Sequence, residues 1–216
     1  MKRKFSTLFL CLLFANVLHA QTWDGSASTD WNTAANWTPA TVPIATGNVT
    51  IPNTVNKPVL ANNITIASLT TATGSGIDFN GFTLSVTGGS NIAGATLSNS
   101  NGATDIVINL SSGGTGSNFI GSTTFTDNVT INFNTNGASY EGHILGNVFS
   151  GNTVFNITGT GSFSSGFNQK SSFGGNLTVN RTIAGITDLF TNGFNFITGN
   201  FSYTNTVGGA DRKSVV

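Results

Sequence analysis

A 24-residue repeat is the feature that most constrains the fold of this chain. It covers residues 125–204 in four units, and equivalent positions are 24 residues apart at every step. The units begin with the segments FTDNVTIN (125–132), FSGNTVFN (149–156), FGGNLTVN (173–180) and ITGNFSYT (197–204). A fixed period of this size is typical of stacked supersecondary units, each of which buries its core only against its neighbours.

The pattern inside each unit predicts strands and not helices. Val129 and Ile131, like Leu177 and Val179, alternate with Thr or Asn, which is the period-2 pattern of a half-buried strand. Helical repeats need roughly 33 residues or more. Leucine-rich repeats have a similar length, but their regular leucine positions are absent. We therefore predict an all-β fold, a right-handed parallel β-helix (β-solenoid) in which each coil has about three short strands and three turns.

In-register coils place equivalent side chains above one another, at a strand spacing of about 4.8 Å. Burying each phenyl ring is worth roughly 1.5–3 kcal/mol, and offset stacking of the rings adds a smaller gain. Asparagines in a column are predicted to form a ladder, because a side-chain amide both donates and accepts hydrogen bonds. The predicted structural ladders consist of Phe125, Phe149 and Phe173, and of Asn128, Asn152, Asn176 and Asn200. Asparagines that line a sugar-binding face are the functional alternative.

The composition supports a folded β-rich chain. Charged residues are only 7 % of the chain, against about 25 % in a typical domain. The 17 phenylalanines and the recurrent aliphatic residues supply far more apolar material than a disordered segment carries. From Gln21 onward, five basic residues face eight acidic ones, a net charge of −3 with no basic patch. This balance argues against nucleic-acid binding.

Residues 1–20 have the layout of a signal peptide. Lys2, Arg3 and Lys4 precede an apolar run from Phe5 to Leu18, and Ala20 ends the segment. The run is too short for a comfortable membrane span, so the mature chain is predicted to have no stable one. The only cysteine lies inside this segment and lacks the small preceding residue of a lipid-modified cysteine. We expect a protein that is secreted or held at the outer cell surface.

Residues 21–60 contain all three tryptophans, Trp23, Trp31 and Trp37. A solenoid must seal the open end of its core, and a tryptophan-rich segment folded over the first coil would do so. We predict an N-terminal cap in this segment. The alternative is that the three indoles stack on sugar rings as a binding platform.

The same segment carries a resemblance. Its Trp-Asp-Gly, Ala-Ala-Asn-Trp and Val-Thr-Ile-Pro motifs, followed by Ile64-Thr-Ile66, resemble the N-terminal region of large secreted or surface-exposed β-helix proteins of the adhesin-like or autotransporter-like kind, common in Bacteroidetes. The resemblance covers roughly residues 21–90 and implies the architecture more than an activity. Typical members end in an export or sorting domain, which is not visible in this chain.

The regular pattern weakens at both sides of the repeat. Between residues 61 and 120 the β-like runs are separated by glycine-rich turns and the period is looser, so solenoid coils of unequal length are expected over 61–209. Residues 210–216 end in Asp-Arg-Lys-Ser-Val-Val, whose codons resemble a sequencing-adapter sequence. We interpret them as a non-native tail, which implies an N-terminal fragment of a longer protein with a bare coil edge open to self-association.

No arrangement of reactive side chains recurs with the repeat. β-Helix enzymes that cleave polysaccharides need clustered carboxylates, or basic residues with bound cations. The candidates considered are Asp78, Asp105, Asp127, Glu141, His143, Lys170, Arg181 and Asp188. Asp127 and Glu141 are not separated by one repeat, so coil stacking does not superpose them. We therefore predict no catalytic, metal-binding or cofactor-binding residues in this chain and no cofactor.

Two functional classes remain open. The first is a structural or adhesive segment of a secreted or cell-surface repeat protein. The second is a carbohydrate-binding or polysaccharide-degrading β-helix protein whose active part lies beyond the C-terminus, with an extracellular polysaccharide as its partner. A self-assembling secreted fibre is a third, weaker interpretation, suggested by the asparagine ladder and the open edge.

Overall fold

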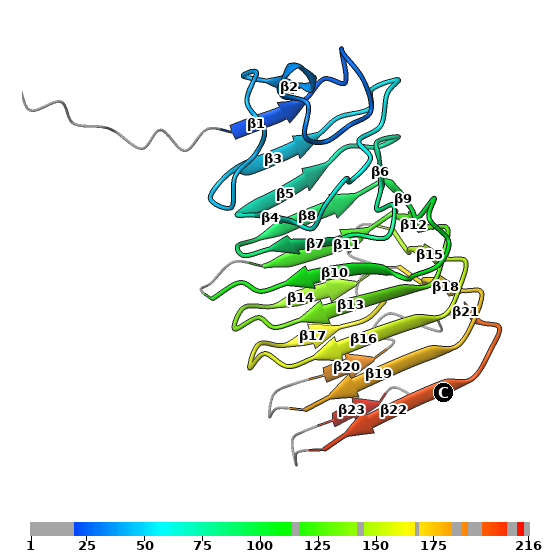
Figure 1. The fold of residues 1–216 in the computed structure, drawn as a ribbon. Helices are drawn as coiled ribbons and strands as arrows, with labels where there is room; N and C mark the ends of the chain where they lie inside the picture. The colour runs from blue at the N-terminus through cyan, green and yellow to red at the C-terminus, as the bar shows by residue number, and fades with distance from the viewer. Residues whose placement is uncertain are drawn as a thin grey trace, which may run out of the picture.

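A computed structural model describes residues 20–113, 117–141, 145–166, 169–182, 187–189 and 196–206, together with the backbone of 211–213. It is an all-β solenoid of about seven turns, built from parallel sheets, with roughly 24 residues per coil. The chain descends from β1 at the top of Figure 1 to β22 and β23 at the bottom, one coil below another. The predicted fold class is thus confirmed. The predicted signal segment lies outside the described residues, apart from Ala20.

Among the described residues three sheets run along the solenoid, and from β5 to β22 each coil contributes one strand to each of them. The ten-stranded sheet contains, in spatial order, β2 (Trp37–Thr38), β1 (Ala20–Trp23), β3 (Asn48–Ile51), β5 (Ser68–Thr71), β8 (Ser90–Ala93), β11 (Asn118–Gly121), β14 (Ser139–Glu141), β17 (Phe163–Ser164), β20 (Thr187–Leu189) and β23 (Asp211–Lys213). Of the strands that the structure describes, only β2 pairs antiparallel, with β1. A short 3-10 turn, η1 (Ala34–Asn36), precedes β2.

The other two sheets are parallel throughout. The seven-stranded sheet contains β4 (Ile64–Ile66), β7 (Thr83–Val86), β10 (Ile106–Leu110), β13 (Val129–Phe133), β16 (Thr153–Ile157), β19 (Leu177–Arg181) and β22 (Phe201–Asn205). The six-stranded sheet contains β6 (Gly76–Asp78), β9 (Thr96–Ser98), β12 (Thr124–Phe125), β15 (Val148–Phe149), β18 (Ser172–Phe173) and β21 (Phe196–Ile197).

Strand register confirms both the strict and the loose parts of the repeat. From β13 onward, the seven-stranded sheet pairs residues 24 positions apart, as in Asn132 with Asn156. Earlier coils vary: Asn48 pairs with Ser68, 20 positions on, whereas Ser90 pairs with Asn118, 28 positions on. Coils of unequal length stay in one stack because the extra residues lie in the turns and the strands keep their register.

The predicted phenylalanine column is present and fully buried. The rings of Phe125 and Phe149 stack with centroids 4.6 Å apart and 8° between their planes, and those of Phe149 and Phe173 with 4.7 Å and 2°. Leu97 and Ile197 continue the column in the neighbouring coils. The alternating burial of each strand places one set of side chains in the core and the other on the surface.

The predicted asparagine column also links its coils, but not through amide-to-amide bonds. The Oδ1 atom of Asn128 accepts the backbone N–H of Asn152 at 2.8 Å, and the same bond joins Asn152 to Asn176 and Asn176 to Asn200, at 2.9 and 2.8 Å. These exposed residues lie at a corner, where a side chain replaces the missing strand partner of the next backbone N–H.

The amide-to-amide ladder instead lies four residues further along each unit. The Nδ2 atoms of Asn132, Asn156 and Asn180 donate to the Oδ1 atoms of Asn109, Asn132 and Asn156, at 2.7, 2.8 and 3.0 Å. These residues occupy outward positions in the middle of a strand, where side chains of successive coils stand side by side. An amide ladder is therefore present, as predicted, but it is formed by Asn109, Asn132, Asn156 and Asn180 and not by the predicted column.

The end of the chain follows the repeat in its backbone. Asp211 pairs with Thr187, 24 positions earlier, so β23 continues the ten-stranded sheet. A non-native tail at residues 210–216 predicts a break in the 24-residue repeat, and the backbone register of β23 does not show that break. That residues 210–216 are non-native stays a prediction.

Candidate binding surfaces

The three tryptophans do not present a sugar-binding platform. Trp23 and Trp31 have no exposed surface and Trp37 is 1 % exposed, because the three rings pack edge to face. The centroids are 5.0 Å apart between Trp23 and Trp37, and 4.8 Å between Trp31 and Trp37. A sugar ring cannot reach a buried indole face, so the sugar-stacking alternative is wrong for these residues. The cluster lies over the N-terminal end of the core, where a cap was predicted.

The carboxylates of Asp78 and Asp127 are used to hold turns. Asp78 Oδ1 accepts the backbone N–H groups of Asn80 and Ser100, both at 2.9 Å. Asp127 Oδ2 accepts the backbone N–H of Asn99 at 3.0 Å and the hydroxyl of Thr126 at 2.7 Å. Each carboxylate therefore joins neighbouring coils at a corner and is not aimed at a reacting group.

Glu141 is buried and fully hydrogen-bonded. Its side chain points into the core from β14 and has no exposed surface. One carboxylate oxygen accepts from Asn147 Nδ2 (2.8 Å) and the Ser171 hydroxyl, and the other from the Ser165 hydroxyl (2.8 Å) and the Gly166 N–H (2.9 Å). Four donors satisfy a carboxylate that could otherwise not be buried. Its role is to tie coils together, which sequence reasoning did not foresee.

The other charged candidates are dispersed. Asp105 and Lys170 are exposed, Arg181 is buried and donates to the Thr187 hydroxyl at 2.6 Å, and Asp188 is half-buried. Oδ1 of Asp188 is buried without a hydrogen-bond partner among the described residues. His143 lies outside those residues. Among those of these groups that the structure describes, none forms a pair of the kind that acid–base catalysis needs.

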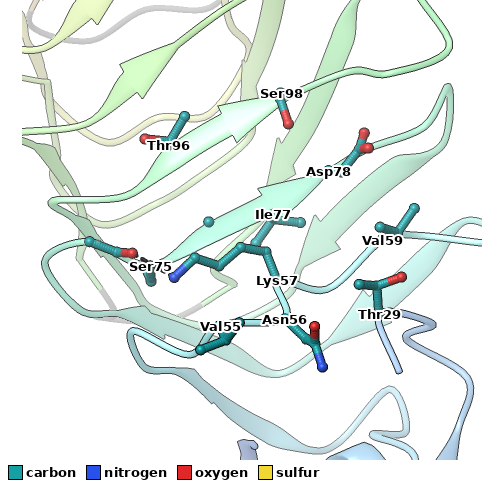
Figure 2. Close-up of a pocket in the computed structure, with 12 residues that line it drawn as sticks. Thr29, Val55, Asn56, Lys57, Val59, Ser75, Ile77, Asp78, Thr96 and Ser98 are labelled. Atoms are coloured by element: carbon teal, nitrogen blue, oxygen red, sulfur yellow. Dashed lines mark hydrogen bonds between the residues drawn. The ribbon is translucent and has the colours of Figure 1, made fainter. Parts of the chain in front are cut away.

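A shallow hollow lies where the loop after β3 crosses the outer side of the six-stranded sheet. It has a volume of about 400 Å³ and is shown in Figure 2. The Lys57 side chain runs along it, and its Nζ donates to Asn53 Oδ1 at 2.6 Å and to the Gly74 carbonyl at 2.7 Å. A Cβ atom at Gly76 would lie 3.1 Å from the Thr96 carbonyl oxygen and at ordinary contact distance, 3.4 Å, from Lys57 Cγ. Val55, at the rim, is 98 % exposed.

The polar groups that line the hollow are partly engaged in bonds within the protein. Lys57 and Asp78 both line it, but each already bonds to protein groups. Ser75 Oγ is buried in its wall without a hydrogen-bond partner among the described residues. The hollow has no nucleophile held by a base, which covalent catalysis would require.

A second surface is the outer face of the seven-stranded sheet, which carries the amide ladder. We call its central column the asparagine row; it comprises Ser85, Asn109, Asn132, Asn156, Asn180 and Thr204, joined by strand register. Asn109 Nδ2 donates to Ser85 Oγ at 3.1 Å, so the hydrogen bonding continues to the serine. All the row residues from Ser85 to Asn180 are half-buried. The strands that carry the row lie one below another in Figure 1.

The ten-stranded sheet carries a smaller aromatic feature on its outer face. The rings of Phe119 and Tyr140, which face each other across β11 and β14, stack with centroids 5.3 Å apart and 7° between their planes. Both side chains are half-buried. This surface pair stacks in parallel, as the phenylalanine rings of the core do.

One carboxyl group at the N-terminal end has a shifted pKa. The backbone N–H of Ser26 donates to Asp24, and with the hydroxyls of Ser26 and Thr38 it lowers the pKa of this exposed carboxyl below its ordinary value. Asp24 thus closes the loop between β1 and β2.

Comparison with protein-family models, curated proteins and solved structures finds no match for this chain. Within the described residues, no three His, Cys, Asp or Glu side chains come together as metal ligands would. The described part of the chain also contains no helix with the length and apolar character needed to cross a membrane.

Proposed function

We propose that this chain is a structural and adhesive segment of a secreted or cell-surface repeat protein. The observation that carries the proposal is the outer face of the seven-stranded sheet, where the same short, uncharged side chains recur on successive coils. A rigid face with a repeated pattern suits attachment to an extended, repetitive surface, because each coil can contribute a similar weak contact.

The arrangement of the carboxylates supports a role without catalysis. Asp78, Asp127 and Glu141 are engaged in hydrogen bonds that hold turns and coils together. Polysaccharide hydrolysis uses two carboxyl groups that flank one bond. Binding of an extracellular polysaccharide without cleavage is the partner relationship that this surface favours.

Retention under flow tests the proposal. Beads coated with the full chain are passed over cellulose, chitin and bacterial cell surfaces, and beads coated with albumin serve as the control. We expect the protein-coated beads to be retained on at least one surface, with no increase in soluble reducing ends. Release of reducing ends would show an enzyme, and retention equal to albumin on every surface would contradict an adhesive role.

A further inference from the structure

We propose that the asparagine row binds a single chain of a neutral, extended polysaccharide, with one sugar unit opposite each coil. This inference rests on the proposed adhesive function and names its binding face and ligand class. Adjacent strands lie about 4.8 Å apart, so the row offers an amide at that interval on four successive strands, with the hydroxyls of Ser85 and Thr204 at its two ends. An extended β-linked glycan advances by a similar distance per sugar unit, and it presents the same hydroxyl groups on one side at every second unit.

The amides of the row have hydrogen-bonding capacity left for a ligand. A side-chain amide has two N–H donors and an oxygen that accepts two bonds. Asn132 and Asn156 each donate one N–H to the preceding coil and accept one from the next. Among the described residues, one N–H and one acceptor position of each of these two amides have no protein partner, and both side chains are half-buried. The ladder also fixes the orientation of each amide, which lowers the entropy lost on binding.

The columns beside the row complete a surface for sugars. On one side are Thr83, Val107, Thr130, Val154, Thr178 and Ser202, and on the other are Thr87, Ser111, Asn134, Thr158, Thr182 and Thr206. Apart from Ser202, the first column offers methyl groups to the C–H faces of a sugar ring, and the second offers mainly hydroxyl groups. None of these residues carries a charge, so the face has no group to pair with uronate or sulfate.

Two double variants separate binding by the row from its contribution to stability. Asn156→Ala with Asn180→Ala removes two inter-coil hydrogen bonds on the face. Asn152→Ala with Asn176→Ala removes two from the exposed corner of the same coils, away from the row. Similar melting temperatures would show that the two variants lose similar stability, and circular dichroism would verify that both are folded.

Calorimetric titration of the full chain with cello- and chito-oligosaccharides of two to six sugars measures the binding. We expect affinity for one series to rise with each added sugar. The face variant should bind the hexamer about tenfold more weakly, and the corner variant should bind as the parent does. Polygalacturonate, an acidic polymer, should bind more weakly than the neutral chains.

Four results would overturn the inference: equal affinity of the face variant and the parent, affinity independent of chain length, preference for polygalacturonate, or no binding of either series. A preference for polygalacturonate would point to the Lys57 hollow. If beads coated with the face variant are retained as well as those coated with the parent, the adhesive function stands while the assignment of its face fails.

Discussion

The tryptophans at the N-terminal end and the phenylalanines of the later coils bury aromatic rings in two different ways. The rings of Trp23 and Trp31 meet Trp37 at 81° and 70°, whereas the ring planes along the phenylalanine column differ by 8° and 2°. A residue repeated in every coil can only stack in parallel on its copies, and such a stack has no natural end. Rings also cross inside the regular coils, where Phe155 meets Phe149 at 72° and Phe173 at 75°, but these residues belong to different columns.

The two regions also differ in their hydrogen bonds, because the indole N–H groups of the cap need acceptors and the phenyl rings do not. Trp23 Nε1 donates to the Asn56 carbonyl and Trp37 Nε1 to the Trp31 carbonyl, both at 2.8 Å. The cap therefore depends on particular loops, while the phenyl rings of the stack pack on their copies in the coils above and below. We expect damage to the cap to stay local and damage to the stack to spread along the solenoid.

Replacement of Phe149 by Asp should have the largest effect. It places a charge without a partner between two stacked rings, and the expected loss is more than about 5 kcal/mol, with loss of cooperative unfolding. Urea denaturation followed by circular dichroism measures it. Phe149→Leu, which keeps the site apolar, should cost roughly 1–3 kcal/mol. An Asp variant that unfolds like the parent would mean that the in-register stack is wrong.

Replacement of Trp37 by Ala should have the next largest effect, about 3–5 kcal/mol, since Trp37 contacts both other indoles. Hydrogen exchange should show faster exchange in β1, β2 and β3 and little change in β16 and β19, because repeat coils are stabilised by their nearest neighbours. Trp37→Phe is the conservative control. Equal loss of protection along the whole chain would remove the distinction between cap and stack.

Replacement of Gly175 by Ala sharpens the comparison at the corner of the regular coils. The added Cβ would lie 2.7 Å from Asn152 Oδ1 and 2.8 Å from the backbone N of Asn152, so both the side chain and the backbone of the preceding coil must shift, at a cost of about 1–3 kcal/mol. Gly113→Ala is the control, because a Cβ there meets no atom within 4 Å, and it should stay within about 0.5 kcal/mol of the parent. Chemical denaturation compares the two; equal stabilities would show that the corner tolerates a side chain.

The smallest expected effect concerns the pH dependence of the cap. The folded state lowers the pKa of Asp24, so Asp24 contributes stability above its unfolded value, near 3.8, and this contribution disappears as the pH falls through the lower folded value. The melting temperature of Asp24→Asn should approach that of the parent as the pH is lowered from 6 to 3. A gap that is constant or grows over this range would contradict the shift.

Strand periodicity carried most of the fold prediction. The exact spacing of Phe125, Phe149 and Phe173 was enough to predict their column, because in-register parallel strands bring every equivalent residue to the same place. The position of the amide ladder was harder to predict, since two columns of asparagines share the same 24-residue period. Whether Asn152 or Asn156 joins amide to amide depends on the direction of each side chain at a corner or in a strand, which the repeat does not encode.

The sequence by itself determined the coil length, the class of fold and the composition of the repeated columns, because these follow from local alternation and a constant period. Only the tertiary structure decided that the tryptophans are buried, that Glu141 is surrounded by four donors and that the loop bearing Lys57 crosses the sheet. Those arrangements join residues of unequal loops and different coils. Their distances are set by how the turns pack, which no local pattern records.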